Sequence, residues 1–331
     1  MTRRSDAAAP ERLPADLRSA RAQFAADVQY YLTQSPRQLP SRYLYDDLGS
    51  ALFEAICRLP WYGITRAELR LLDSVGAEIF RRVAPLSTLV ELGPGSGDKL
   101  RTLASARPFD GTLAAHIVDL SRSALDVSVR TLEHLDRLQV IAHQAPYEDG
   151  LSDAMRLRSR AGRALVLFLG SNIGNFDPPG AHAFLRGIRS ELRDGDALLL
   201  GADLVKPVRV LQRAYDDPLG VTAAFNRNLL VRINRELEGN FELDQFAHRA
   251  VWNQTESRVE MHLIARRTQA IHIDAAGLAF TMPRGDLIWT ESSYKYRVDR
   301  LAAIIEGAGF HLDGQWIDRA DGFALSLASA V

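Results

Sequence analysis

Apolar residues near the start of the chain recur at the spacing of a helix. From Leu17 to Leu32 they stand three or four positions apart, which predicts one amphipathic helix. The proline- and tyrosine-rich residues 35–47 are expected to form a loop, and a second, short helix is expected over 49–58. The first 15 residues show no such pattern and are expected to be a frayed, polar tail.

A longer helix is predicted next, and both of its ends carry signals. Thr65 and Glu68 have the spacing of a capping box, in which each side chain bonds a backbone N–H at the start of the helix. Leu72 and Phe80 belong to one apolar face, and Pro85 is expected to end the helix.

After Pro85 the pattern changes to short, nearly continuous apolar runs. These runs cover 87–93, 114–121, 139–145, 164–172 and 197–205. Such runs, separated by segments long enough for a helix, are typical of parallel strands that helices cover on both faces. Asp177 followed by Pro178 supplies the two residues that a helix start favours. The sequence therefore predicts a doubly wound α/β core.

The alternation of strands and helices is interrupted after this core and resumes near the C-terminus. The predicted elements are helices at 207–217, 221–238 and 298–308 and strands at 258–266, 269–274, 311–318 and 322–329. Gly239 is expected to end the second helix. We therefore place an insertion at about 206–294 and expect the first 60 residues to pack with it.

Composition narrows the function classes. The chain has 331 residues, which is room for about two domains. Its 40 Lys and Arg against 41 Asp and Glu give a net charge of −1, whereas a protein that mainly binds nucleic acid needs a basic surface. No run reaches the ~18 apolar residues of a membrane helix, and the N-terminus lacks the apolar centre of a signal peptide. We expect a cytoplasmic protein that binds neither nucleic acid nor membrane.

Cysteine and histidine give no disulfide or metal signal. The single cysteine, Cys57, lies in an apolar helical pattern and is interpreted as a packed thiol. No two of the eight histidines stand four positions apart with an acid between them, so metal dependence is not expected.

A glycine-rich loop follows the first apolar run. Gly93, Gly95 and Gly97 form the pattern E-x-G-x-G-x-G, and glycines let a backbone approach a ligand closely. Asp98 stands where a dinucleotide-binding loop has its third glycine, which disfavours a nicotinamide cofactor. Asp119 ends the second run, where a carboxylate can accept hydrogen bonds from both hydroxyls of a ribose.

The glycine loop and the acid after the second strand are together typical of Rossmann-like methyltransferases that use S-adenosylmethionine. Two alternatives stay open on these residues alone. The ligand could be another nucleotide-type molecule, or the loop could be a structural turn and Asp119 a capping residue.

Polar residues follow the fourth apolar run, at the edge of the sheet where ligands bind. Asn172 and Asn175 stand there, although Ser171 and Asn172 could instead satisfy the backbone of a turn. The Asp177-Pro-Pro sequence resembles the acid-Pro-Pro motif of base-modifying methyltransferases. It begins past the end of the strand, however, and is interpreted as a helix cap.

A carboxylate and a hydroxyl stand two positions apart late in the insertion. If the segment is extended, Glu291 and Ser293 point to the same face. Such a pair can clasp the two nitrogens of an imidazole or a similar ring. Tyr215 is expected at a helix end near the start of the insertion. For all three residues, ordinary surface polarity is the alternative.

Longer segments carry a resemblance to a known family. They include SRYLYDDLGSALFEAI, TRAE, VELG, FLGS-x-IGN, RAYDDP, FNRN, INREL and TE-x-S-x-K, and the matches run from about residue 38 to the C-terminus. These segments resemble the histidine Nα-methyltransferases of ergothioneine biosynthesis. The resemblance implies a Rossmann-like class I methyltransferase core, at 63–205 and 295–331, and a second, α+β substrate-binding domain, at 1–62 and 206–294.

The resemblance also implies the reaction. Three methyl groups would pass in succession from S-adenosylmethionine to the α-amino group of L-histidine, which gives hercynine. Two other interpretations stay open: the same fold acting on another amino acid, such as tryptophan or tyrosine, and a non-catalytic protein that binds S-adenosylmethionine. A monomer is favoured, although the sequence does not fix the oligomeric state.

Site residues follow from the resemblance position by position. The resemblance assigns the cofactor contacts to Tyr45, Gly93, Gly95, Lys99 and Asp119, and it places Tyr147 where it would stack on the adenine. Asn175 and Tyr215 would bind the carboxylate of the substrate. Tyr62, Glu291 and Ser293 would bind its ring, and Met261 would line the pocket. For catalysis, Tyr45 or a water held near Asn175 would accept the proton of the amine. Pro146 departs from the family pattern, which has an aspartate near the adenine amino group.

Overall fold

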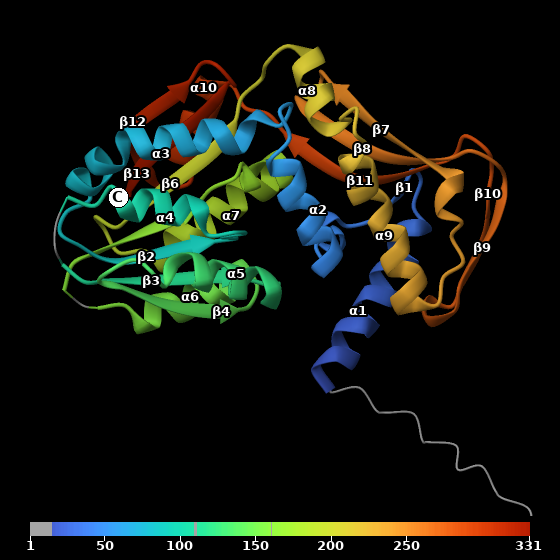
Figure 1. Cartoon of the computed structure of the whole chain (residues 1–331), viewed down its shortest axis with the longest axis horizontal. Coiled ribbons are helices and arrows are strands. Elements are labelled where there is room, and N and C mark those ends of the chain that lie inside the picture. Colours follow the sequence, from blue (N-terminus) through green and yellow to red (C-terminus); the bar gives the residue numbers. More distant parts are fainter. Residues whose placement is uncertain (1–14, 109–110, 160) are drawn as a thin grey trace, which may run out of the picture.

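The computed structural model describes residues 15–108, 111–159 and 161–331, and its largest element is a seven-stranded sheet (Figure 1). The strands are β2 (Leu86–Leu92), β3 (Leu113–Asp119), β4 (Leu138–Gln144), β5 (Arg163–Phe168), β6 (Ala197–Asp203), β12 (Phe310–Asp318) and β13 (Phe323–Ala330). Their order is β12-β13-β6-β5-β2-β3-β4. Strands β2 to β6 are parallel, and β13 is antiparallel to both of its neighbours. The strand order reverses at β2, and in such sheets ligands bind at the carboxyl ends of the strands beside that point.

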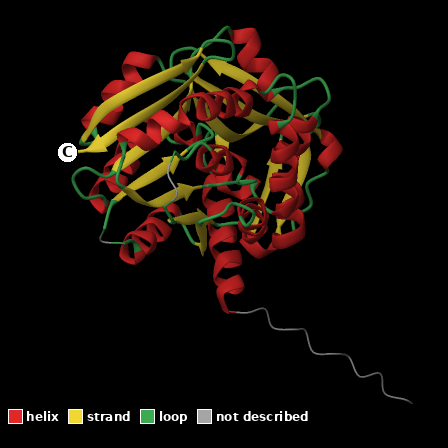
Figure 2. Ribbon diagram, turned by 60° about the vertical axis from the view of Figure 1, so that its left-hand side comes forward, coloured by secondary structure: helices red, strands yellow, loops and turns green. Residues whose placement is uncertain are grey.

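Helices cover both faces of this sheet (Figure 2). They are α3 (Gly63–Arg82), α4 (Asp98–Ser105), α5 (Arg122–Leu132), α6 (Tyr147–Leu157), α7 (Pro178–Glu191) and α10 (Val298–Gly307). Neighbouring residues of β2 point to opposite faces, so Leu89 packs in the core beneath α3, α4 and α5, and Val90 packs beneath α6, α7 and α10. The prediction of a doubly wound α/β core is confirmed.

A second, smaller sheet lies to one side of the first (Figure 1). It contains β1 (Arg37–Gln38), β11 (Leu287–Tyr294), β8 (Arg258–Ala265) and β7 (Phe246–Asn253) in that order, and β9 (Gln269–Ile273) pairs with β10 (Leu278–Met282) separately. Its helices are α1 (Ala15–Leu32), α2 (Asp47–Cys57), α8 (Val208–Tyr215) and α9 (Val221–Leu237). Helix α9 packs on β7 and β8 and contacts α2, which lies between the two sheets. All these elements fall within 15–62 and 206–294.

The two parts meet where β11 returns to the larger sheet. Tyr296 N donates a hydrogen bond of 2.9 Å to Asp203 O at the end of β6. Strand β11 also contacts the 3-10 helix Asn172–Asn175, which follows β5. The insertion is thereby joined to the carboxyl edge of the parallel strands.

The predicted capping box is wrong. Helix α3 begins at Gly63, so Tyr62 rather than Thr65 is its N-cap residue, and Tyr62 makes no side-chain cap hydrogen bond. Glu68 is fully buried, and its carboxylate accepts hydrogen bonds from Gly170 N. The Glu68 side chain, which the local pattern assigned to the start of the helix, therefore bonds a backbone N–H far away in the chain.

Several element boundaries also differ from the predictions. The run 164–172 is a strand only to Phe168, and the segment 35–47 contains β1 and the 3-10 helix Ser41–Leu44 as well as loop. Helix α9 ends at Leu237, and Glu238, rather than Gly239, is the left-handed residue that follows it. The insertion also holds β7 and β10, which were not predicted.

The Asp177 cap is confirmed, since its side chain accepts a hydrogen bond from Gly180 N at the start of α7. The chain before Ala15, predicted as a polar tail, lies outside the described residues. Among the residues that are described, no helix has both the length and the apolar character needed to cross a membrane.

Candidate active site

The glycine loop between β2 and α4 is shaped for close contact. Gly93, Gly95 and Gly97 have φ angles of +74°, +58° and +79°, which residues other than glycine rarely adopt. A Cβ atom on Gly93 would lie 2.7 Å from the Tyr147 hydroxyl and 3.0 Å from the amide nitrogen of Asn172. The loop backbone therefore lies directly against these two side chains, and a residue larger than glycine does not fit at position 93.

Asp119 lies one strand away from this loop. Strands β2 and β3 pair in parallel, and Gly93 N donates a hydrogen bond of 2.8 Å to Val118 O. The Asp119 carboxylate accepts a hydrogen bond of 2.8 Å from Ser121 N and another from Leu120 N. Burial raises its pKa, and its backbone hydrogen bonds act in the opposite direction. Asp119 and the glycine loop thus share one edge of the sheet, as the predicted ribose contact requires.

Lys99 and Tyr147, two other predicted cofactor contacts, reach the same edge. The Lys99 ammonium lies 3.8 Å from the Glu68 carboxylate and close to Gly170. Burial lowers the pKa of Lys99, but the neighbouring carboxylates outweigh burial and raise it above its usual value. Tyr147 is the first residue of α6, and its ring packs edge-on against Phe168 with centroids 5.7 Å apart.

A cavity of about 470 Å³ opens beside this edge, and both parts of the molecule line it. Its lining residues are Tyr45, Phe53, Ile56, Tyr62, Ile64, Gly170, Ser171, Asn172, Asn175, Ala214, Tyr215, Thr222, Phe225, Met261, Glu291 and Ser293. Most of these residues are aromatic or aliphatic, and a few polar groups converge among them, as in small-molecule sites.

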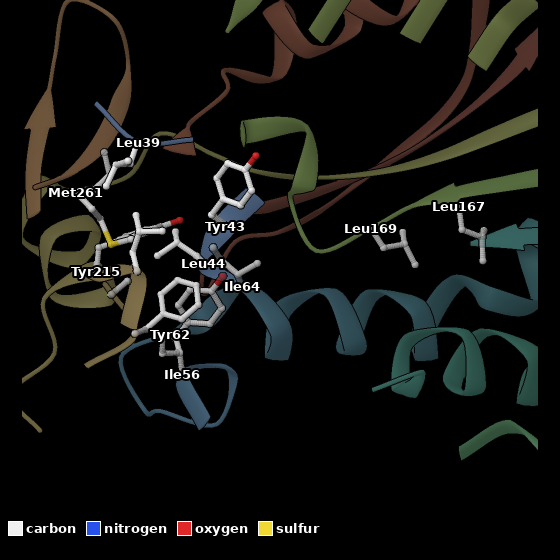
Figure 3. Close-up of a cluster of buried hydrophobic side chains, with 14 of the residues drawn as sticks. Leu39, Tyr43, Leu44, Ile56, Tyr62, Ile64, Leu167, Leu169, Tyr215 and Met261 are labelled. Carbon is white, nitrogen blue, oxygen red and sulfur yellow. The ribbon is translucent and has the colours of Figure 1, made fainter. Parts of the chain in front are cut away.

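All six residues predicted to contact a substrate line this one cavity, together with Tyr45. They come from separate elements: the N-cap of α3 (Tyr62), the 3-10 helix after β5 (Asn175), the last residue of α8 (Tyr215), β8 (Met261) and β11 (Glu291 and Ser293). Figure 3 shows Tyr62, Tyr215 and Met261 gathered in one region, with Ile56 and Ile64 beside Tyr62. The pattern in β11 is confirmed, because Glu291 and Ser293 do face the same space.

Glu291 and Tyr215 give the cavity its polar character. Burial raises the pKa of Glu291 to about 7, although the charge of Lys295 lowers it. The Tyr215 hydroxyl lies 2.8 Å from the Ser293 hydroxyl. Within the described residues no group donates a hydrogen bond to the Glu291 carboxylate. A ligand in the cavity would therefore meet one acceptor that has no partner and one hydroxyl pair.

Aromatic rings form another wall. Tyr45 packs edge-on against Phe225 and Phe53, with centroids 5.5 and 5.6 Å apart, and Tyr62 packs against Tyr215 at 6.3 Å. Burial raises the pKa of both Tyr45 and Tyr62 well above the usual value, so both are neutral phenols. Aromatic faces of this kind favour a cationic group beside them.

The sequence analysis missed two buried charges behind the cavity. The Lys295 ammonium lies 2.7 Å from both the Tyr215 and the Ser293 hydroxyl oxygens and 3.1 Å from the Asp203 carboxylate. Lys295 stands two positions after Ser293, so the same period of two that paired Glu291 with Ser293 also pointed to Lys295. Asp203 gave no local signal, because its partners come from a distant part of the chain.

Ser171 and Asn172 were alternatively expected to satisfy the backbone of a turn. The Ser171 hydroxyl instead accepts a hydrogen bond of 3.0 Å from Asp203 N, at the end of the distant strand β6, which is a structural role. Asn172 lines the cavity and approaches Gly93. Among the described residues no three His, Cys, Asp or Glu side chains are grouped to hold a metal ion.

Comparison with known proteins identifies a family. The model of the family described as "Histidine-specific methyltransferase, SAM-dependent" matches residues 24–330. The Histidine N-alpha-methyltransferase of Mycobacterium tuberculosis is 41% identical over 92% of this chain and 94% of its own length. Ergothioneine biosynthesis protein 1 of Schizosaccharomyces pombe is 30% identical over 83% of this chain and 36% of its length. An L-tryptophan methyltransferase of Psilocybe serbica is 27% identical, and the alignment covers 85% of both chains.

Proposed function

The chain belongs to the family of histidine-specific, S-adenosylmethionine-dependent methyltransferases, and on this premise we propose that it trimethylates the α-amino group of L-histidine to form hercynine in ergothioneine biosynthesis. One observation carries the proposal. Glu291 and Ser293, which suit a ring with two nitrogens, share a cavity with Tyr215 and Asn175, and this cavity adjoins the glycine loop.

The edge of the larger sheet is the place for the methyl donor. S-adenosylmethionine supplies a methyl group on a sulfonium, which a nitrogen lone pair can displace. Gly93 and Gly95 would let the backbone approach the donor, and Asp119 would accept hydrogen bonds from its ribose hydroxyls. Tyr147 would stack on the adenine, and the Lys99 ammonium, which lies beside Gly170 and Glu68, would also contact the donor.

Histidine would be held at both of its ends. Asn175 and Tyr215 are placed to bind the carboxylate, and Glu291 and Ser293 to bind the two ring nitrogens, with Tyr62 and Met261 packed beside the ring. Fixing a molecule at two ends leaves one group free to face the donor, here the amine. This positioning supplies most of the rate, because it replaces an encounter in solution by a prearranged one.

The amine must lose a proton before it can attack. Tyr45 is a neutral phenol, and its oxygen would accept a hydrogen bond from the amine and orient the lone pair. A water held near Asn175 would then take the proton. The aromatic wall of Tyr45, Tyr62 and Phe225 suits the permanent positive charge that the amine acquires as methyl groups accumulate.

We also propose that the chain has two domains with separate tasks. The core, 63–205 and 295–331, would bind the methyl donor, and the second domain, 1–62 and 206–294, would bind the substrate. The distribution of strands supports this division, since no strand of the second sheet comes from the core ranges.

The test is direct. The protein is incubated with S-adenosylmethionine and, separately, with L-histidine, L-tryptophan or L-tyrosine, and mass spectrometry counts the methyl groups added. Products of histidine with one, two and three methyl groups support the proposal. Methylation of tryptophan or tyrosine in preference to histidine would identify the alternative substrate class. Calorimetric binding of S-adenosylmethionine without turnover of any amino acid would indicate a non-catalytic protein.

A further inference from the structure

Asn172 lies where the cavity meets the glycine loop. It lines the cavity, and a Cβ atom on Gly93 would come within 3.0 Å of its amide nitrogen. A Cβ atom on Gly170 would lie 3.6 Å from its amide oxygen and 3.8 Å from its amide nitrogen. A methyl group that leaves a donor on the loop for a nitrogen in the cavity has to cross this junction. The Asn172 amide is therefore beside the path of the transferred group.

The amide of Asn172 is available to a ligand. An amide has one oxygen that accepts hydrogen bonds and two N–H groups that donate them. Within 15–108, 111–159 and 161–331, no residue forms a hydrogen bond with this amide. The neighbouring Ser171 differs, because its hydroxyl is already bonded by Asp203 N. Asn172 is thus the polar side chain of this turn that has no structural partner.

The turn that carries Asn172 is held from three elements. Ser171 has a φ of +61°, which residues other than glycine seldom adopt, and such a conformation persists where the surroundings determine it. Its hydroxyl is bonded by Asp203 N of β6, and the backbone N–H before it donates to Glu68 of α3. The Tyr296 hydroxyl, beyond β11, donates at 3.2 Å to the backbone carbonyl after Asn172. The position of the amide at the sheet edge is therefore fixed.

An amine that attacks a methyl group needs its lone pair aimed at that group. A neutral primary amine has one lone pair and two hydrogens, and the hydrogens point to the sides when the lone pair faces the methyl group. Acceptors placed at the sides therefore orient the lone pair without blocking the reaction. The proposed function gives one hydrogen to the oxygen of Tyr45, which lines the same cavity. The second hydrogen needs another acceptor at the junction, and the Asn172 oxygen can supply it.

We propose that Asn172 orients the substrate amine by accepting one of its two hydrogens with the amide oxygen, so that the lone pair faces the methyl donor. The inference rests on the proposed function, because it assumes that an amine is held in the cavity. In each transfer the proton of the ammonium first passes to water. The nitrogen lone pair then forms the new N–C bond, and the electrons of the broken S–C bond stay on sulfur. Asn172 neither gives nor takes a proton.

Successive methylation removes the hydrogens on which this contact depends. The attacking form of histidine has two N–H groups, that of Nα-methylhistidine has one, and that of Nα,Nα-dimethylhistidine has none. Asn172 therefore assists the first transfer most and the third not at all. A residue that binds the carboxylate, the ring or the donor assists all three transfers equally, because those groups do not change.

The test compares the wild type with Asn172→Ala on these three compounds as separate substrates. Initial rates give kcat/KM for each at one pH and saturating S-adenosylmethionine. The substitution changes no charge, so the protonation of each free substrate cancels in the ratio of wild type to variant. We expect a loss of about three- to tenfold with histidine, the effect of one lost hydrogen bond between neutral groups. The loss should be smaller with Nα-methylhistidine and about twofold or less with Nα,Nα-dimethylhistidine.

Asn175→Ala is the matched control, because Asn175 belongs to the same 3-10 helix and also lines the cavity. The proposed function places Asn175 at the carboxylate, which all three substrates share, so its loss should be equal with all three. Thermal unfolding shows whether each variant is folded, and calorimetry should show unchanged affinity of Asn172→Ala for S-adenosylhomocysteine. If Asn172→Ala does not fold, Asn172→Leu takes its place, since leucine has a similar shape and no acceptor.

The inference is overturned by a loss of equal size with all three substrates, by one that is largest with Nα,Nα-dimethylhistidine, or by no loss at all. A folded variant with weaker affinity for S-adenosylhomocysteine would also overturn it, because Asn172 would then bind the donor. A wild type that methylates none of the three compounds would instead refute the proposed function, so the two failures can be told apart.

Discussion

Glu291→Ala is the sharpest test of how the substrate ring is bound. The Glu291 carboxylate lines the cavity and has no hydrogen-bond donor of its own among the described residues, so it is available to a ring N–H. A hydrogen bond to a charged group contributes about 1.5–3 kcal/mol. The substitution should therefore lower kcat/KM for histidine by about 10- to 100-fold, since each 1.4 kcal/mol is a factor of ten.

Steady-state methylation of histidine by the variant measures this loss. A matched control is Glu260→Ala, because Glu260 lies on the neighbouring strand β8, bonds to Arg258 and Asn253, and does not line the cavity. Unchanged binding of S-adenosylhomocysteine shows that the cofactor edge is intact in both variants. Histidine kinetics of Glu291→Ala equal to those of Glu260→Ala would show that the ring does not bind at β11.

Three further predictions concern the cofactor edge and the stability of the fold. Gly93→Ala places a Cβ atom 2.7 Å from the Tyr147 hydroxyl at a positive φ, so calorimetry should show affinity for S-adenosylhomocysteine reduced by about tenfold or more; full affinity would contradict the close approach. Glu68→Ala removes the buried acceptor of Gly170 N, and denaturant unfolding should show a loss of about 3 kcal/mol, whereas a loss near zero would show that this contact contributes little. Burial raises the pKa of Glu291 from 4.5 to about 7. Between these two pH values the folded chain keeps a proton on Glu291 that the unfolded chain has released, so the free energy of unfolding falls as the pH rises through this range. Glu291→Gln should therefore unfold at a higher temperature than the wild type at about pH 8 and at nearly the same temperature at about pH 4; an equal difference at both would refute this.

Regular elements were predictable where one face of an element is consistently apolar. The inner parallel strands β2, β3, β5 and β6 are buried on both sides, so they appear in the sequence as continuous apolar runs, whereas the edge strand β4 is partly exposed. Strand β7 was not predicted, because only Phe246 and Ala250 among its residues are buried and they stand four apart. A strand of this kind is held in place by its pairing with β8, which local sequence does not reveal.

Predictions failed where a side chain has a partner far away in the chain. Thr65 and Glu68 match a capping box locally, yet Glu68 bonds the backbone of Gly170, more than 100 residues later. Asp203 gave no signal for the same reason, since it pairs with Lys295. In both cases the buried charge required a specific partner, and that requirement outweighed the local preference.

The position of the cavity depends on the connection between β11 and β6, and the sequence predicted only the polar residues on β11. Strand β11 carries Glu291 and Ser293, and Lys295 directly follows the strand at the same period of two. The chain after the strand is tied to β6 through the hydrogen bond from Tyr296 N to Asp203 O. Because the strand is anchored at the edge that carries the glycine loop, these three polar side chains are held at a fixed distance from that loop. A change in the anchoring residues would therefore move the substrate contacts relative to the cofactor edge without altering a single residue that lines the cavity. The ion pair of Asp203 and Lys295 lies at this anchor, so it helps to position the substrate contacts although it does not line the cavity.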